Sequence, residues 1–413
     1  MTHVASEMKR SGFTIPLLIG GATTSRMHTA VKISGEYEEP VIHVADASRC
    51  VQVASQLLNE NQKIAFNTEL EADYERYRKR YENRSQAVDL LDIEVARQNK
   101  LKFDWSGYEV AKPAMTGLKV INDLAIQDLI PFIDWTPFFH TWQLRGKFPR
   151  ILEDATVGTE AKKLFADAQI MLEEFCNNSN LKAQGVVGLF PANSVGDDDI
   201  EIYTDDTRTK QLNKVYCLRQ QRVFPDGRPN LTLADFVAPK ESGIPDYIGA
   251  FAVTAGLGLD ELIEGYDSEH DIYKNIMAKA LADRLAEAFA EYLHKKVRTE
   301  LWGYIQNEDL ENDELIKERY QGIRPAPGYP ANPDHRQKEV IWELLQPEKL
   351  GITLTESLAM LPASSVSGFY FSHPDARYFG LGKLKRDQVE NYAARMEEST
   401  ELTERWLASS LAY

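Results

Sequence analysis

Cysteine is scarce in this sequence, and the patterns that mark secretion or membrane insertion are missing. The three cysteines, Cys50, Cys176 and Cys217, lie outside any CxxC or Cys/His spacing, so neither a disulfide framework nor a zinc cluster has support. No stretch reaches the roughly 18 consecutive apolar residues of a membrane-spanning helix, and the N-terminus lacks the layout of a signal peptide. We therefore expect a cytoplasmic protein with buried thiols and no bound metal.

Positive charge is also in short supply. Lysine and arginine number 47 against 63 aspartates and glutamates, which gives a formal net charge of −16. Such a charge disfavours nonspecific binding to nucleic acid phosphates, so we expect neither nucleic acid nor a membrane among the partners. The hydrophobic share of 43% in 413 residues can still bury a sizeable core, and the length favours a globular chain of two domains.

Common catalytic signatures are missing as well. The sequence contains no HExxH, no P-loop and no GxSxG. Gly256 and Gly258 form part of a glycine loop, but the dinucleotide fingerprint needs a third glycine for close packing of its helix. We interpret Ala255–Asp260 as a turn at the start of a helix, which leaves a Rossmann-type methyltransferase without support.

The first 65 residues alternate strand and helix signals. Ile15–Ile19 and Val41–Val44 are short apolar runs, typical of parallel strands covered on both faces, and Val51–Leu58 predicts a helix. Because two strands do not make a stable sheet, residues 1–65 are predicted to be the incomplete end of an α/β, Rossmann-like domain. The highly charged residues 66–84 are predicted to form a helical connector.

From residue 85 to 413, helices alternate irregularly with isolated strands, which indicates an α+β fold. The strand-like runs are Val186–Phe190, Asp199–Tyr203, Tyr247–Val253 and Ser367–Phe371. The clearest helix is predicted over Asn275–Leu301 from the spacing of its apolar residues. Near the C-terminus, Asp387 and Glu390 predict a capping box at the start of another helix.

Two acidic residues lie on a face of the long predicted helix that is away from its apolar stripe. Asp283 and Glu287 are four residues apart, and like charges at this spacing cost a little helix stability. Periodicity alone favours a solvated acidic face. A ligand-binding face is the alternative.

The segment Arg324–Pro330 is unusually stiff, with three prolines, one glycine and a single arginine at its head. Proline fixes φ and removes an amide donor, so the segment cannot be regular helix or strand. A stiff loop presents Arg324 in a defined geometry, and a guanidinium fork suits bidentate binding of a carboxylate. A linker between domains is the alternative interpretation.

This segment begins a longer run, RPAPGYPANPDH followed by IWELL, that resembles the S-adenosylmethionine-binding reactivation domain of cobalamin-dependent methionine synthase. Further stretches similar to that family are Ile133–Trp142, Gly146–Asp154, Val186–Asn193, Asp246–Thr254, Lys279–His294 and Ser365–Phe379. Chance agreement over so many ordered segments is negligible. The resemblance implies that residues 85–413 form a reactivation domain with a mainly antiparallel sheet and flanking helices.

The N-terminal part resembles the end of the same family's cobalamin-binding domain. The matching motifs are IGGATTS and HVADAS, and paired glycines let a bulky ligand approach the backbone closely. The resemblance places Gly20, Gly21 and Ala47 beside the nucleotide tail of cobalamin. The DxHxxG motif that ligates cobalt in the family does not occur. The folate and homocysteine modules are missing too, so zinc is expected only in parts of the enzyme that this chain lacks.

The resemblance assigns contacts with S-adenosylmethionine to Asp134, Glu287, Glu318, Arg324, Gly328, Tyr329, Tyr378 and Phe379. Arg324 is expected to hold the carboxylate of the ligand, and Asp134 its amino acid or ribose end. Tyr378 and Phe379 would frame the adenine through backbone contacts, and the two glutamates would be further acceptors. Phe379 stands where a second tyrosine is common, so no hydroxyl role is expected there. No catalytic side chain is expected, because cofactor and sulfonium carry the chemistry.

The implied function is the rescue of oxidised cobalamin by one electron and the methyl group of S-adenosylmethionine, which restores methylcobalamin. This supports methyl transfer from 5-methyltetrahydrofolate to homocysteine in methionine biosynthesis. The implied partners are the remaining modules of methionine synthase and a flavodoxin-like or reductase electron donor. The chain would thus be part of a methyltransferase and not competent for the full reaction alone.

Other function classes fit the sequence to different degrees. The chain could be a stand-alone S-adenosylmethionine-binding module or a separately encoded subunit of a split synthase. An autonomous methyltransferase would need its own acceptor site and a Rossmann glycine loop, and the sequence has neither.

Overall fold

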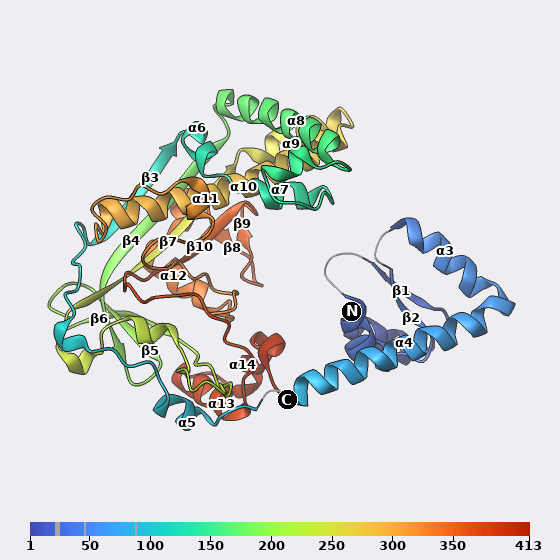
Figure 1. Ribbon diagram of the computed structural model, residues 1–413, viewed down its shortest axis with the longest axis horizontal. Helices are drawn as coiled ribbons and strands as arrows, with labels where there is room; N and C mark the ends of the chain where they lie inside the picture. The colour runs from blue at the N-terminus through green and yellow to red at the C-terminus, as the bar shows by residue number, and fades with distance from the viewer. Residues whose placement is uncertain (21–24, 45–46, 87–88) are drawn as a thin grey trace. The chain divides into compact units, whose positions relative to one another are not determined.

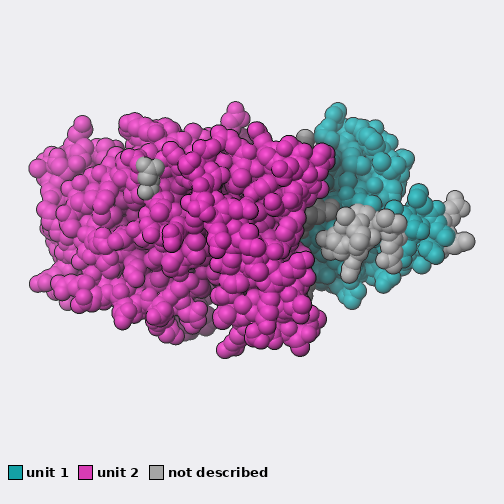
Figure 2. All heavy atoms as spheres, turned by 90° about the horizontal axis from the view of Figure 1, so that it is seen from above, with its two compact units in different colours: residues 1–89 teal, residues 90–413 magenta. Residues whose placement is uncertain are grey.

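The computed structural model describes residues 1–20, 25–44, 47–86 and 89–413 (Figure 1). The chain divides into two compact units, Met1–Asp89 and Leu90–Tyr413 (Figure 2). Within the described ranges, no helix has both the length and the apolar character needed to cross a membrane.

The first unit combines two short parallel strands with helices. β1 (Leu17–Gly20) and β2 (Val41–Val44) pair in parallel and confirm the two predicted strands. The helical segments are α1 (Thr2–Arg10), α2 (Arg26–His28), η1 (Thr29–Ile33), η2 (Ser34–Glu36), α3 (Ala47–Leu58) and α4 (Glu60–Gln86). Tyr74 of α4 is buried and donates a hydrogen bond to the carbonyl of Val41 at 2.7 Å. The charged helix therefore packs against the strand pair, whereas the assignment of this unit to a cobalamin-binding domain stays a prediction.

The second unit is built on a six-stranded antiparallel sheet. The strand order is β10-β7-β4-β5-β6, and β3 pairs with β4 beside this path. The strands are β3 (Gly117–Leu124), β4 (Lys182–Val195), β5 (Asp199–Tyr203), β6 (Gln211–Tyr216), β7 (Asp246–Leu257) and β10 (Ser365–Tyr370). The first three predicted runs lie in β4, β5 and β7, and the fourth overlaps β10, which ends at Tyr370. The expected α+β class with an antiparallel sheet is confirmed.

Two hydrophobic cores cover the faces of the central strands. Phe251 and Val253 of β7 enter the core formed with α10, whereas Ile248 and Ala250 enter the core formed with α12. This alternation explains why β7 is apolar throughout. The helices of the unit are α5 (Ile93–Gln98), α6 (Ile126–Leu129), α7 (Trp135–Thr141), α8 (Gly158–Asn177), α9 (Leu259–Ser268), α10 (Ile272–Lys296), α11 (Asn312–Leu315), α12 (Gln337–Leu345), α13 (Arg386–Arg395) and α14 (Thr400–Trp406). Figure 1 shows α8, α9 and α10 together and apart from α12.

The turn predicted at Ala255–Asp260 is confirmed at Gly258, because β7 continues to Leu257 and α9 begins at Leu259. Gly258 precedes the first residue of α9 and has a left-handed φ of +81°. A β-carbon there would lie 2.1 Å from the carbonyl oxygen of Asn180. Only glycine satisfies both the backbone conformation and the close approach.

Two expectations from the sequence are wrong. The N-cap of α13 is Lys385, not Asp387, because the Asp387 carboxylate accepts tertiary hydrogen bonds from the Ile93 amide at 2.7 Å and from Gln221 at 2.9 Å. Cys176 is exposed while Cys217 is buried, since the neighbouring Phe175 occupies the inward face of α8. The side chain of Cys50 lies outside the described residues.

We predict that residues 90–413 fold without the first unit. The backbone amide of Leu91 donates to the carbonyl of Gln221 at 2.6 Å, and Ile93 is buried beside Asp387, so the fold of the second unit begins at this point. A chain of residues 90–413 should therefore keep the melting temperature of this unit. A chain of residues 100–413 should melt lower, because loss of the buried Ile93 alone removes roughly 2 to 5 kcal/mol. Calorimetric melting of the two chains tests this, and equal melting temperatures would contradict it.

Candidate functional site

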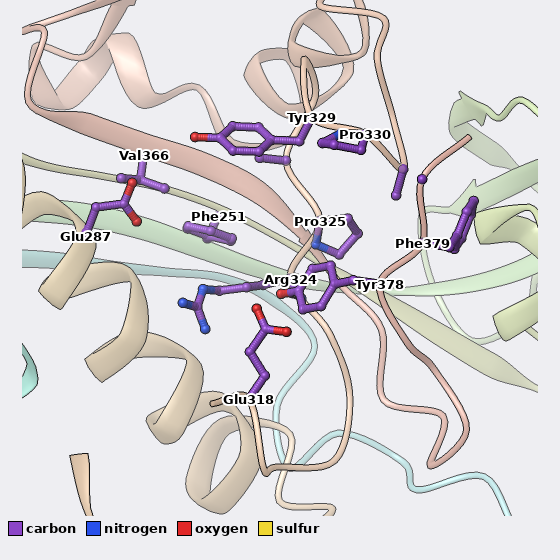
Figure 3. Close-up of a pocket in the computed structure, with 13 residues that line it drawn as sticks. Phe251, Glu287, Glu318, Arg324, Pro325, Tyr329, Pro330, Val366, Tyr378 and Phe379 are labelled. Carbon is purple, nitrogen blue, oxygen red and sulfur yellow. Dashed lines mark hydrogen bonds between the residues drawn. The ribbon is translucent and has the colours of Figure 1, made fainter. Parts of the chain in front are cut away.

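A cavity of about 520 Å³ opens on the second unit between α10, the loop after Arg324, β10 and the segment Tyr378–Gly380 (Figure 3). This volume is typical of sites for small molecules. The lining residues are Phe251, Glu287, Glu318, Arg324, Pro325, Ala326, Tyr329, Pro330, Ala331, Val366, Tyr378, Phe379 and Gly380. Most of these residues are apolar or aromatic, and the charged ones are Glu287, Glu318 and Arg324.

The loop after Arg324 is fixed at its start by backbone hydrogen bonds to β10 and the residue that follows it. Ile323 and Phe371 exchange two such bonds of 3.0 Å, and the amide of Phe369 in β10 donates to the carbonyl of Pro325 at 3.0 Å. Gly328 has a φ of +96°, and a β-carbon there would lie 2.2 Å from the ring of His335. Gly328 therefore shapes the loop, and the stiffness inferred from the prolines matches a loop anchored to the sheet.

Arg324 is held from behind through one of its terminal nitrogens. Nη1 lies 2.7 Å from Oε2 of Glu291, donates to the hydroxyl of Tyr320 at 2.7 Å and lies 3.3 Å from Nδ1 of His294. Among the described residues, neither Nε nor Nη2 donates a hydrogen bond, and neither is an enclosed atom. One edge of the guanidinium is thus fixed to the protein while the other edge is free to receive a carboxylate.

The support of Arg324 continues into a buried ionic network. Glu291 lies 3.7 Å from Arg298, which is fully buried and pairs with both oxygens of Glu308 at 2.5 and 2.7 Å. The guanidinium of Arg298 also stacks at 4.1 Å over the ring of Tyr320. Buried charges are tolerated only with such partners, so this network fixes the position of Arg324.

Electrostatics keep the cluster in one protonation state. Burial lowers the pKa of Arg324, but the carboxylate of Glu291, together with the hydroxyls of Tyr320, Tyr378 and Tyr370, outweighs this and raises the pKa overall. Burial, together with the cations Arg298 and Arg324, lowers the pKa of His294 well below its usual value. His294 is therefore neutral near pH 7 and does not add a second positive charge beside Arg324.

Two carboxylates face the same cavity from different elements. Glu287 projects from α10, and Glu318 follows α11, with its side chain turned toward Arg324 (Figure 3). Glu318 has a φ of +55°, a left-handed conformation that is strained for a residue with a β-carbon. Partial burial raises the pKa of Glu318, Arg324 opposes this shift, and Glu291 adds to it.

Aromatic side chains form much of the remaining wall. The hydroxyl of Tyr378 accepts a hydrogen bond from the backbone amide of Arg324 at 3.0 Å, which ties the two segments together. Figure 3 shows the ring of Tyr378 beside Arg324, whereas the ring of Phe379 lies apart from both. Tyr329 is 61% exposed at the rim, and Phe251 stacks on Tyr370 at 4.7 Å.

The structure gathers most of the residues that the resemblance selected. Six of them line the cavity, namely Glu287, Glu318, Arg324, Tyr329, Tyr378 and Phe379. Asp134 does not line it and is the N-cap of α7, where its carboxylate accepts from the amide of Thr136 at 3.0 Å. Asp283 accepts a hydrogen bond from Ser364 at 2.7 Å and does not line the cavity either. The roles of all these residues stay predictions.

The residues predicted to lie near cobalamin belong to the first unit. Gly20 is the last residue of β1 and Ala47 is the first of α3. Gly21 lies outside the described residues. Their proximity to a cobalamin tail stays a prediction.

Sequence reasoning missed the residues that hold Arg324 from behind. Glu291 and His294 lie on α10 one and two turns after Glu287, so continuing the acidic face by four residues would have found Glu291. Tyr320 gave no signal, because its contact with Arg324 depends on the turn that follows α11.

The fold and the cavity define an α+β ligand-binding domain whose site places one guanidinium fork among carboxylates and aromatic rings. A family model described as vitamin B12 dependent methionine synthase, activation domain, matches residues 125–397. The solved structure described as the MetH reactivation domain bound to AdoHcy is 55% identical, covers 78% of this chain and 99% of that chain, and superposes with a TM-score of 0.76. The chain belongs to the family of activation domains of cobalamin-dependent methionine synthase, as the resemblance implied. It is therefore part of a methyltransferase.

We predict that Glu291→Gln destabilises the protein. The substitution removes the charge partner of Arg324, whose side chain is only 19% exposed, and a buried cation without its partner is costly. The free energy of unfolding should fall by about 1 to 3 kcal/mol in urea titrations. Glu287→Gln is the matched control on the same helix, because Glu287 forms no ion pair within the described part of the chain, and its effect should stay within about 0.5 kcal/mol. Equal losses for the two variants would contradict the support role of Glu291.

We also predict a pH-dependent effect of Glu318→Gln. Because the pKa of Glu318 is raised on folding, the folded state binds the proton more readily in the window between the unfolded and the folded pKa. The unfolding free energy of the wild type therefore falls as pH rises through this window. The variant has no titrating carboxyl at this position, so its unfolding free energy relative to the wild type should rise with pH. The rise should be only a few tenths of a kcal/mol, because the side chain is exposed. Urea titrations from about pH 4 to pH 7 test the sign, and a relative stability that falls with pH would refute it.

Proposed function

We propose that this cavity binds S-adenosylmethionine and presents its methyl group to cobalamin. The observation that carries the proposal is the charge pattern. Among the described residues, the charged groups lining the cavity are one guanidinium, Arg324, and two carboxylates, Glu287 and Glu318. S-adenosylmethionine carries the opposite set, with one carboxylate and two cations, the ammonium and the sulfonium. The family membership and the solved relative bound to AdoHcy support the same ligand class.

The free edge of Arg324 sets the orientation of the ligand. Its Nε and Nη2 atoms would take the carboxylate in a bidentate contact. Glu287 and Glu318 would then stand near the cationic groups, and the Tyr378 and Phe379 backbone would border the adenine. Asp134 would meet the amino acid or ribose end, and Gly328 and Tyr329 would shape the loop that borders the ligand.

In this proposal the residues of the site act by positioning the methyl donor. Cobalamin, when bound, supplies the cobalt that receives the methyl group. The residues of this chain hold the donor by its carboxylate and cations and thereby fix the direction of the sulfonium methyl. Methyl transfer turns the sulfonium into a neutral thioether, so the attraction of the two glutamates weakens in the product, which favours its release.

In this proposal the remaining residues of the chain belong to neighbouring parts of methionine synthase. Residues 1–65 would be the C-terminal part of an α/β cobalamin-binding domain, with Gly20, Gly21 and Ala47 near the nucleotide tail. Residues 66–84 would connect it to the reactivation domain of residues 85–413. The remaining modules of methionine synthase and a flavodoxin-like or reductase donor would supply the other reactants, including the electron.

We predict that Arg324→Lys weakens S-adenosylmethionine binding by about tenfold. The ammonium of lysine can still pair with Glu291, but a point charge cannot offer a planar fork to a carboxylate. One charge-assisted contact is worth roughly 1.5 to 3 kcal/mol, and 1.4 kcal/mol corresponds to a factor of ten. Titration calorimetry at fixed salt measures the change.

The control for this experiment separates binding from folding. Arg324→Ala leaves Glu291 buried without a partner, so it should lose stability as well as affinity. The double variant Arg324→Ala and Glu291→Gln removes both charges and should recover stability without recovering affinity. Wild-type affinity in either arginine variant would overturn the assignment of Arg324.

A further inference from the structure

A second cavity, of about 490 Å³, lies beside the first in the same unit. Tyr378, Phe379 and Gly380 line both cavities, so this segment forms the wall between them. The charged residues that line the second cavity are all arginines, namely Arg222, Arg228 and Arg377. The cavity does not include the carboxylates of the first site.

The three guanidiniums are hardly compensated by acidic groups. Arg222 and Arg377 are exposed and form no ion pair within the described part of the chain. Arg228, whose side chain is 61% exposed, has only Asp226 at 3.7 Å. The protein has a formal net charge of −16, so a cavity lined by three cations is locally opposite in sign to the protein as a whole. Their mutual repulsion is relieved when an anion binds among them.

Aromatic contacts and hydrogen bonds hold the segments that line this cavity. Arg228 stacks over the ring of Phe224 at 4.2 Å, and Arg222 lies 5.9 Å from the same ring. One aromatic side chain thus holds two guanidiniums near each other and limits their freedom. The buried Gln220 accepts a hydrogen bond from the amide of Leu231 at 3.0 Å and donates one to the carbonyl of Gly380 at 2.7 Å. It therefore links the segments that carry the arginines.

We propose that the second cavity binds a compact multivalent anion, a phosphate or a small phosphorylated compound. A phosphate group has several charged oxygens, and guanidinium forks match its geometry. One guanidinium is enough to bind a carboxylate in bidentate fashion, so three around one cavity suit an anion with more charge and more oxygens. A ligand there stiffens the wall formed by Tyr378–Gly380, so anion binding changes the affinity of the neighbouring site. This second part rests on the proposed function, whereas the anion site does not.

Titration calorimetry with inorganic pyrophosphate tests the site on the 413-residue protein at fixed ionic strength. We expect saturable binding with a dissociation constant in the micromolar to low millimolar range. The double variant Arg222→Gln and Arg377→Gln should weaken it about tenfold or more, because two charge-assisted contacts are lost. Arg145→Gln, a change of another exposed arginine outside the cavity, should leave the affinity unchanged. Thermal melting checks that each variant is folded, and Arg228→Gln is an independent single variant for the same comparison.

The outcomes distinguish the parts of the proposal. The anion site is overturned if pyrophosphate gives no saturable heat of binding. It is also overturned if the cavity variants and Arg145→Gln lose the same amount of pyrophosphate affinity. Tighter binding of adenosine 5′-phosphate than of pyrophosphate supports an organic phosphate, and the reverse order supports a free one. An S-adenosylmethionine affinity that is identical with and without saturating pyrophosphate overturns the coupling. Failure of S-adenosylmethionine to bind at all would refute the proposed function but not the anion site, since the pyrophosphate titration does not require it.

Discussion

The buried pairing of Arg324 with Glu291 is the interaction on which the site depends. Glu291 and Tyr320 engage Nη1 of the guanidinium, whereas Nε and Nη2 have no hydrogen-bond partner among the described residues. Without this partner the arginine would be a partly buried, uncompensated cation with several available rotamers. With it, the fork is oriented before any ligand arrives, so less entropy is lost on binding.

The fold brings together three segments that are far apart in the sequence. α10 supplies Glu287 and Glu291, the proline-rich loop supplies Arg324, and the Tyr378 segment closes the wall. β10 connects them, because it pairs with β7 and also anchors the loop through the carbonyl of Pro325. A rigid sheet thus carries loops that are individually irregular, which is the usual way to place binding groups accurately.

The sequence predicted the parts of this arrangement that leave a local pattern. Prolines around Arg324 indicated a stiff loop, and apolar runs located four strands of the second sheet. It did not predict β3 and β6, whose residues are less apolar, or the role of Glu291, because a buried carboxylate is recognisable only once its partner is known. Asp387 was misassigned as a cap for a related reason. Its partner Ile93 lies 294 positions away in the sequence, and tertiary contacts prevail over local capping there.

The central claim is that the free edge of Arg324 receives the carboxylate of S-adenosylmethionine. The most direct test measures, by calorimetry, the binding of S-adenosylmethionine and of its decarboxylated analogue to the wild type and to the double variant Arg324→Ala and Glu291→Gln. If the account is correct, loss of the carboxylate weakens binding about ten- to a hundredfold in the wild type and has almost no effect in the double variant. The same loss in both proteins would show that the carboxylate lies elsewhere and would contradict the account.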